Sequence, residues 1–134
     1  MRYLRQRKGQ AIVELALLVS FLLLLGAGAI QFGILYGIKL RVEHAAREGA
    51  RWASVHALDG TDTDIKNQVI AAAADLDPPI SAANVTITTP DGRVGDKPIY
   101  VTVVYPYSPR VFLVSVLLPS TINFTHTAVM RIEA

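Results

Sequence analysis

The side chains best spaced for chemistry are His44 and Glu48, which lie four positions apart in a helix-forming stretch. Residues at that spacing share one helix face and can bind a metal ion together, but no third ligand follows at a metal-binding spacing and no His-Glu-x-x-His motif occurs. Asp62 and Asp64 are paired carboxylates at a place where a helix cap is expected. His126 lies on the apolar face of an alternating segment, which favours a core or edge histidine over a catalyst. We therefore predict no metal site, no cofactor and no catalytic centre.

Other motifs that carry chemistry are missing or weak. The sequence has no cysteine, which excludes disulfides, thiolate nucleophiles and Cys-type zinc sites. It has no Gly-x-Ser-x-Gly elbow, phosphate loop or dinucleotide fingerprint. Asn84-Val85-Thr86 and Asn123-Phe124-Thr125 match the glycosylation sequon, but so short a pattern arises by chance, and both copies lie in predicted strands. A membrane-tethered enzyme or ligand-binding domain remains an alternative without a motif to support it.

Glu14 is the one charged residue among the 28 positions from Ala11 to Ile38. A helix needs about 20 apolar residues to cross a bilayer, so this segment predicts a transmembrane helix. The segment is longer than the apolar region of about 7–15 residues that is typical of a cleaved secretory signal. Four basic residues and no acid precede it: Arg2, Arg5, Arg7 and Lys8. By the positive-inside rule this head is cytoplasmic and the remainder of the chain lies outside.

The charge of the remaining chain argues against a nucleic-acid partner. After Ile38, 9 Lys and Arg stand against 10 Asp and Glu, so the pI near 9.1 comes from the head and not from a basic surface on a folded domain. A hydrophobic content of 51% is also too high for a disordered chain.

Glu14 lies five residues after Gly9, and two interpretations of its carboxylate are open. If the chain were cut after Gly9, Gln10 would become the first residue and Glu14 the fifth. The Glu14 of a neighbouring copy could then neutralise the new α-amino group and set the axial stagger between subunits. The simpler interpretation is that Glu14 is an interfacial residue whose carboxylate reaches water.

Helix-compatible sequence continues past the apolar segment without a proline. A helix from about Gln10 to Ala57 would be roughly 70 Å long, half in lipid and half outside as a stalk. Small residues recur along it at four-residue spacing, which favours a helix–helix interface, although Gly and Ala are common in membrane helices anyway. The positions are Ala29, Gly33, Gly37, Ala45, Gly49 and Ala53.

The rest of the chain predicts a small α+β domain. Apolar residues at helical spacing indicate a second helix over about Ile65–Leu76, stopped by Pro78-Pro79. Alternating residues predict three strands, at Asn84–Thr89, Pro98–Tyr105 and Thr121–Ile132, which would form an antiparallel sheet packed on the stalk. Val111–Leu118 is too short to span a membrane. Burial as a loop or short helix is favoured, and a lip that meets the membrane surface or a neighbouring subunit is the alternative.

Several stretches together resemble a known family. A basic leader that ends in Gly9, with Glu14 five residues into an apolar helix, resembles the prepilin peptidase site of the type IV pilin superfamily. The chain is similar to the TadE-like minor pilins of tight-adherence (Tad, or Flp) pili over its first 57 residues and, more loosely, its last dozen. The stretches that carry the resemblance are Gly9-Gln10-Ala11-Ile12-Val13-Glu14-Leu15-Ala16, Gln31-Phe32-Gly33, Ala45-Ala46-Arg47-Glu48-Gly49-Ala50-Arg51 and Thr127-Ala128-Val129-Met130-Arg131-Ile132-Glu133.

The resemblance implies a structural function and not an enzymatic one. It implies a pilin-like α+β fold, with a leader at 1–9, a transmembrane helix at 10–38, an extracytoplasmic helical stalk at 39–57 and an outer domain at 58–134. The implied partners are a prepilin peptidase, other pilin subunits, the inner-membrane pilus machinery and the lipid bilayer, with homo- or hetero-oligomers formed through the first helix. Tyr or Phe is usual in such families at the position of Leu15, and an uncleaved single-pass component of an envelope secretion or adhesion apparatus is the alternative.

Overall fold

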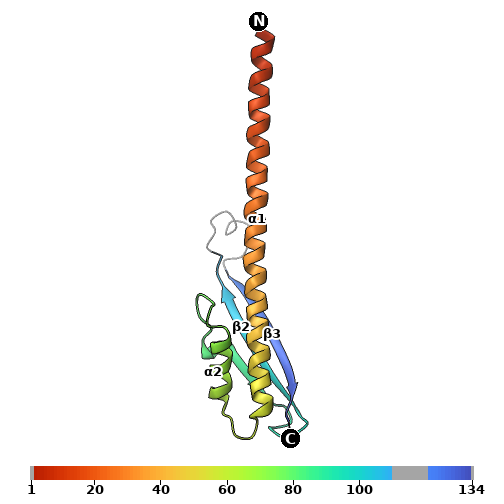
Figure 1. The fold of residues 1–134 in the computed structure, drawn as a ribbon, viewed down its shortest axis with the longest axis vertical. Helices are drawn as coiled ribbons and strands as arrows, with labels where there is room; N and C mark the ends of the chain where they lie inside the picture. The colour runs from red at the N-terminus through yellow and green to blue at the C-terminus, as the bar shows by residue number, and fades with distance from the viewer. Residues whose placement is uncertain (1, 110–120, 134) are drawn as a thin grey trace. The chain divides into compact units, whose positions relative to one another are not determined.

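The computed structural model describes residues 2–109 and 121–133, with side chains from residue 9 onward, so Val111–Leu118 lies outside the described residues. The chain divides into two compact units, an N-terminal unit (Met1–Leu35) and a C-terminal unit (Tyr36–Ala134). The elements in chain order are α1 (Arg2–Val55), α2 (Asp62–Ala72), the 3-10 turn η1 (Ala82–Asn84), β1 (Val85–Thr88), β2 (Pro98–Tyr107) and β3 (Ile122–Arg131) (Figure 1). The predicted α+β fold class, with a long first helix, a short helix and a three-stranded antiparallel sheet, is confirmed.

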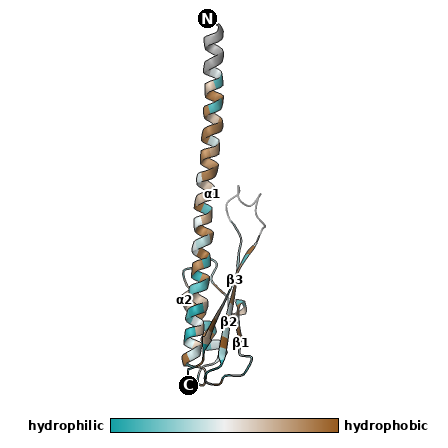
Figure 2. Ribbon diagram, turned by 90° about the vertical axis from the view of Figure 1, so that its right-hand side faces the viewer, coloured by the Kyte–Doolittle hydropathy of each residue, from teal (hydrophilic) through white to brown (hydrophobic). Residues whose placement is uncertain are grey.

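The helix of the N-terminal unit is exposed at every residue from 9 to 26, whereas Gln31 further along it is only 4% exposed. Its large apolar side chains from Ile12 to Leu25 are each at least 45% exposed, and the ribbon there is almost uniformly hydrophobic (Figure 2). Water would be a poor solvent for such a surface, whereas lipid tails match it on every face. Among the described residues, one helix is long and apolar enough to cross a membrane. The chain therefore has the composition of a single-pass membrane protein.

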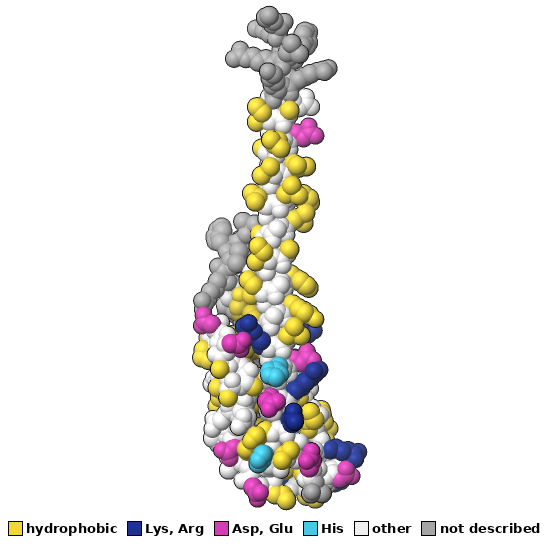
Figure 3. Space-filling view, in the orientation of Figure 1, with side chains coloured by type: hydrophobic (Ala, Val, Ile, Leu, Met, Phe, Trp, Pro, Cys, Tyr) yellow, Lys and Arg dark blue, Asp and Glu magenta, His cyan; other side chains and the backbone are white. Residues whose placement is uncertain are grey.

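In the C-terminal unit the remainder of α1 packs by one face into a core. The small size of Gly49 makes this possible, because a Cβ atom there would lie 2.3 Å from Val69 Cγ2 of α2 and 3.5 Å from Val101 Cγ1 of β2. At Gly49, α1 is thus in close contact with both α2 and the sheet. The buried residues that α1 contributes to this core are Ile38, Val42, Ala45, Ala46, Ala50 and Ala53. Charged side chains gather on this unit (Figure 3).

The sheet has the strand order β1-β2-β3, with both pairs antiparallel. The alternation predicted from the sequence is confirmed, since β2 buries Ile99, Val101, Val103 and Tyr105 while its intervening residues are partly exposed. In β3 the odd-numbered residues are exposed and the even-numbered residues face the core. The end of the sheet is tied to the end of α1, because the Glu133 N–H donates to Ser54 O at 2.9 Å.

The bounds of α2 differ from the predicted Ile65–Leu76. The helix begins three residues earlier, at Asp62, because Thr61 caps it. It ends at Ala72, well before Pro78-Pro79. Leu76 and Ile80 are each only 4% exposed, so the chain leaves the helix early and turns to place both side chains in the core. Tertiary burial outweighed local helix propensity at this end.

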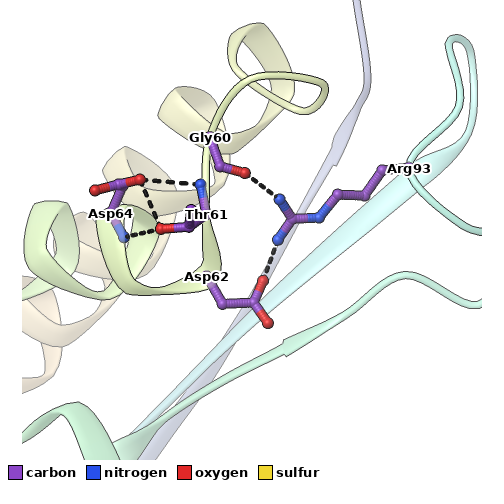
Figure 4. Close-up of polar contacts among 5 residues, drawn as sticks. All are labelled: Gly60, Thr61, Asp62, Asp64 and Arg93. Carbon is purple, nitrogen blue, oxygen red and sulfur yellow. Dashed lines mark hydrogen bonds and ion pairs between the residues drawn. The ribbon is translucent and has the colours of Figure 1, made fainter.

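The turn between α1 and α2 is held by polar contacts from two directions (Figure 4). Asp64 accepts hydrogen bonds from the Thr61 N–H at 2.9 Å and the Thr61 hydroxyl at 2.6 Å, and the Thr61 hydroxyl accepts one from the Asp64 N–H. From the β1–β2 loop, Arg93 donates to Gly60 O at 2.5 Å and pairs with Asp62. Gly60 is required here, because a Cβ atom would lie 2.7 Å from both His56 O and Trp52 Cη2.

Replacing Gly49 with alanine tests the close approach of α1 to α2. We expect Gly49→Ala to destabilise the C-terminal unit by about 1–3 kcal/mol, because Val69 is buried and β-branched and cannot move aside freely. Gly37→Ala is the matched control, since its Cβ would meet nothing within 4 Å and helix propensity would rise. Denaturant unfolding of the full chain in detergent micelles measures both. Equal stability of the two variants would contradict the packing described.

The cap of α2 predicts a pH dependence. The Thr61 hydroxyl, and then the Thr61 N–H, lower the pKa of Asp64 below its ordinary value of 3.8. A carboxylate with a depressed folded pKa stabilises the fold above the unfolded pKa and loses that contribution as the pH falls through the folded pKa. We expect Asp64→Asn to lower the melting temperature at pH 7 and to reduce the loss of stability on acidification below pH 3.8.

Melting curves of the full chain in detergent between pH 7 and pH 2.5 measure the effect of Asp64→Asn. Asp91→Asn is the control, because it removes an exposed carboxylate of the β1–β2 loop without changing the cap. The proposed role of Asp64 is wrong if the two variants have the same pH profile.

Candidate functional site

The residues of the predicted processing segment lie on one side of α1. Gly9, Gln10, Val13, Glu14 and Leu17 line a shallow hollow on the helix surface. Both Gln10 and Glu14 are exposed, and four residues of helix place them one turn apart. Among the described residues Glu14 has no hydrogen bond or ion pair, so its carboxylate is available to a group from another molecule. A single carboxylate in an apolar helix surface can recognise a cation within the membrane.

Residues 2–8 continue α1 as helix, but the side chains of Arg2, Arg5, Arg7 and Lys8 lie outside the described residues. The orientation of the membrane helix therefore remains a prediction from the sequence.

The first half of the small-residue series is open. Ala29 and Gly33 are exposed and Gly37 is half-buried. A Cβ atom at Gly33 or Gly37 would meet nothing within 4 Å. These positions thus leave a stretch of helix backbone that another helix can approach closely.

The second half of the series has a different role. Ala45, Gly49 and Ala53 are buried inside the C-terminal unit, where Gly49 admits Val69 and Val101. These three residues are therefore covered by other parts of the chain. The positions of the predicted interface that remain open are Ala29, Gly33 and Gly37. Four-residue spacing of small residues is the same signal in both halves, so the sequence alone could not separate them.

The histidines and carboxylates considered for chemistry are dispersed. His44 and Glu48 are exposed on α1, and in the described ranges no group of three His, Asp or Glu side chains could hold a metal ion. Asp62 is paired with Arg93 beside the α2 cap. His126 is half-buried on the core side of β3, opposite Val103. This arrangement offers structural contacts and no assembled catalytic group.

Sequence reasoning missed the cluster at the end of α1. The Trp52 and His56 rings stack with centroids 4.3 Å apart, and Gly60 fits against the Trp52 ring. Arg93 holds the turn by donating a hydrogen bond to Gly60 O. The four-residue spacing of Trp52 and His56 was the available signal, but nothing near Arg93 in the sequence indicates its partners 31 and 33 positions away.

Comparison with known proteins gives a family match in the N-terminal part of the chain. Residues 9–51 match the model of a family described as TadE-like protein. No curated protein and no solved structure matches the chain. The matched segment is about a third of the chain and includes Gly9, Glu14 and the small-residue positions up to Gly49. The predicted resemblance to TadE-like proteins is thus confirmed over this segment.

Enlarging the two open glycines tests the interface. We expect Gly33→Leu with Gly37→Leu to impair association of α1 with other membrane helices, because the leucines fill the space that close approach requires. Membrane insertion and the stability of the C-terminal unit should not change, since both positions are open within the chain. Cross-linking of two differently tagged copies in native membranes measures the association. Unchanged cross-linking would remove the interface. Gly28→Leu is the matched control, because Gly28 is another open glycine and lies on the side of the helix away from Gly33 and Gly37.

Proposed function

We propose, from the TadE-like match, that this chain is a pilin-like structural subunit of a Tad-type pilus. The observation that carries the proposal is the division of one continuous helix, α1, between two environments. Its first part, up to Leu35, has an apolar surface in which Glu14 is the one carboxylate, and its last part is the scaffold of a small α+β domain. The TadE-like match, over residues 9–51, includes segments of both parts. A helix of this kind anchors a folded domain to a membrane, and its side surface is available for contact with other helices. We assign it the role of a minor pilin that initiates, caps or anchors the filament.

Glu14 has a specific part in this proposal. A carboxylate in an apolar helix costs about 2.5–3.5 kcal/mol at the centre of a membrane and less near its edge. An α-amino group on Gln10 of an adjacent subunit would offset that cost by forming an ion pair. The pair forms only when two helices are staggered by the distance between residues 10 and 14. Glu14 would thus select one axial register during assembly.

The same proposal names the partners and the location. A prepilin peptidase would cut between Gly9 and Gln10 on the cytoplasmic side of the inner membrane, next to the basic head. The C-terminal unit would lie outside the cytoplasm and reach the extracellular space in a pilus after processing. Other pilin subunits and the inner-membrane pilus machinery would contact α1 through Ala29, Gly33 and Gly37.

A second candidate is an uncleaved single-pass component of an envelope secretion or adhesion apparatus. The observation in its favour is that α1 is helical without interruption from Arg2 through Gly9. Cleavage at Gly9 would require the first turns of the helix to open, whereas a permanent anchor needs no such opening. The ends of helices unfold locally at little free-energy cost, so the need for opening favours the uncleaved anchor only slightly.

The N-terminal residue of the protein from its native envelope separates the two candidates. We expect the mature chain to begin at Gln10 and to be present in sheared filament fractions. We expect Glu14→Ala to insert normally and to be processed, but to be depleted from filaments because the ion pair is lost. Intact-mass measurement and immunoblots of membrane and filament fractions provide the readouts. A chain that begins at Met1 and stays in the membrane would support the anchor instead, and wild-type filament levels of Glu14→Ala would remove the role of its charge.

A further inference from the structure

The two glycosylation sequons of the sequence have different structural environments. Asn84 ends the turn η1, where its Oδ1 accepts a hydrogen bond from the Ser81 N–H at 3.3 Å and completes a capping box. Asn84 is half-buried. An Asn side chain held in a cap is a poor substrate for a transferase, because the cap must break before the amide can enter an active site.

Asn123, in contrast, is exposed at the surface. It is exposed near the start of β3, with its side chain on the face of the sheet opposite the core. Thr125 is exposed on the same face, because residues i and i+2 of a strand point to the same side. The amide and the hydroxyl of this sequon thus lie next to each other and are open together.

The backbone of Asn123 is also free of the strand ladder. The Ile132 N–H donates to Lys97 O at 2.9 Å. In an antiparallel pair every second residue forms hydrogen bonds with the partner strand, so the even-numbered residues of β3 form them with β2. The N–H and C=O of Asn123 then point to the outer edge of the sheet, where β3 has no further strand among the described elements. Its register partner is Pro106, which has no N–H to donate.

The surroundings of Asn123 would accept a sugar without burying a charge. The outward face of the sheet carries neutral side chains next to this position, mostly β-branched or hydroxylated. The nearest are Thr125, Val104 and Pro106, and further along the same face the hydroxyl oxygens of Thr102 and Thr127 are 2.8 Å apart. A flat neutral surface of this kind offers both hydrogen-bonding groups and methyl groups to a carbohydrate.

We propose that Asn123 is an N-glycosylation site, and that Asn84 is not. In the reaction, the Asn123 side-chain nitrogen Nδ2 attacks the anomeric carbon of an oligosaccharide carried on a polyprenyl diphosphate. The new N–C bond forms as the bond from that carbon to the diphosphate oxygen breaks. The diphosphate leaves with the electron pair, and the transferase removes the amide proton. Thr125 is the recognition residue of the sequon.

This inference rests on the proposed orientation of the chain, because such transferases act on the outer side of the membrane. The test is glycopeptide mass mapping of the full chain isolated from its native envelope. We expect a glycan mass on the peptide that contains Asn123 and none on the peptide that contains Asn84. Enzymatic removal of the glycan should leave Asp at position 123.

Variants of the sequon distinguish modification from a change in folding. Asn123→Gln and Thr125→Ala should lose the glycan completely, whereas Thr125→Ser should keep it because the hydroxyl remains. Asn84→Gln should keep it as well. Thermal unfolding of all four variants checks that the C-terminal unit is intact.

Protease accessibility of the C-terminal unit in intact spheroplasts separates failure of this inference from failure of the proposed orientation. An unmodified Asn123 in a chain whose C-terminal unit is accessible from outside overturns the glycosylation site alone. An inaccessible unit overturns the orientation, and the glycosylation site with it. A glycan on Asn84 or on a threonine hydroxyl would also overturn the assignment.

Discussion

The close contact of α1 with α2 and the sheet is the interaction on which the C-terminal unit depends. The chain has no cysteine, so no disulfide can hold the unit together, and burial of apolar surface must do so. That burial is efficient only because α1 presents alanines and Gly49 to its neighbours, which lets Val69 and Val101 reach the helix surface. The same face supplies six of the buried core residues. The capped turn at Thr61 and the Arg93 contacts then fix where α2 begins.

The helix α1 thus passes through two environments, an apolar one suited to lipid and the core of the C-terminal unit. Before residue 36 its large apolar side chains face outward and suit lipid, and from Ile38 onward one face of the helix is buried in the protein core. Small residues have opposite uses along this helix. Gly33 and Gly37 leave open space for another molecule, whereas Gly49 leaves space that this chain fills itself. The proposed pilin-like function uses both parts of this division, the apolar helix surface and the compact C-terminal unit.

Much of the fold could be predicted because its signals are local. Period-two alternation located β2 and β3, and Ile99, Val101 and Val103 are buried at alternate positions of β2 as such a pattern requires. The predicted end of α2 was wrong because the chain leaves the helix at Ala72 and turns so that Leu76 and Ile80 are buried in the core. No local sequence pattern indicates where such burial will end a helix. The Arg93 contacts with Gly60 and Asp62 were missed for the same reason, since they join loops far apart in the chain.

The sequence by itself determined the membrane helix, the lone carboxylate at Glu14, the class of the fold and the TadE-like character of residues 9–51. Each of these depends on composition or on spacing within one element, which the printed residues contain in full. Only the tertiary structure decided which small residues of α1 are occupied and which sequon is exposed. Ala29 and Ala45 have the same side chain, and so do Asn84 and Asn123. Their difference lies in what packs against them, and contacts between distant parts of the chain form only on folding.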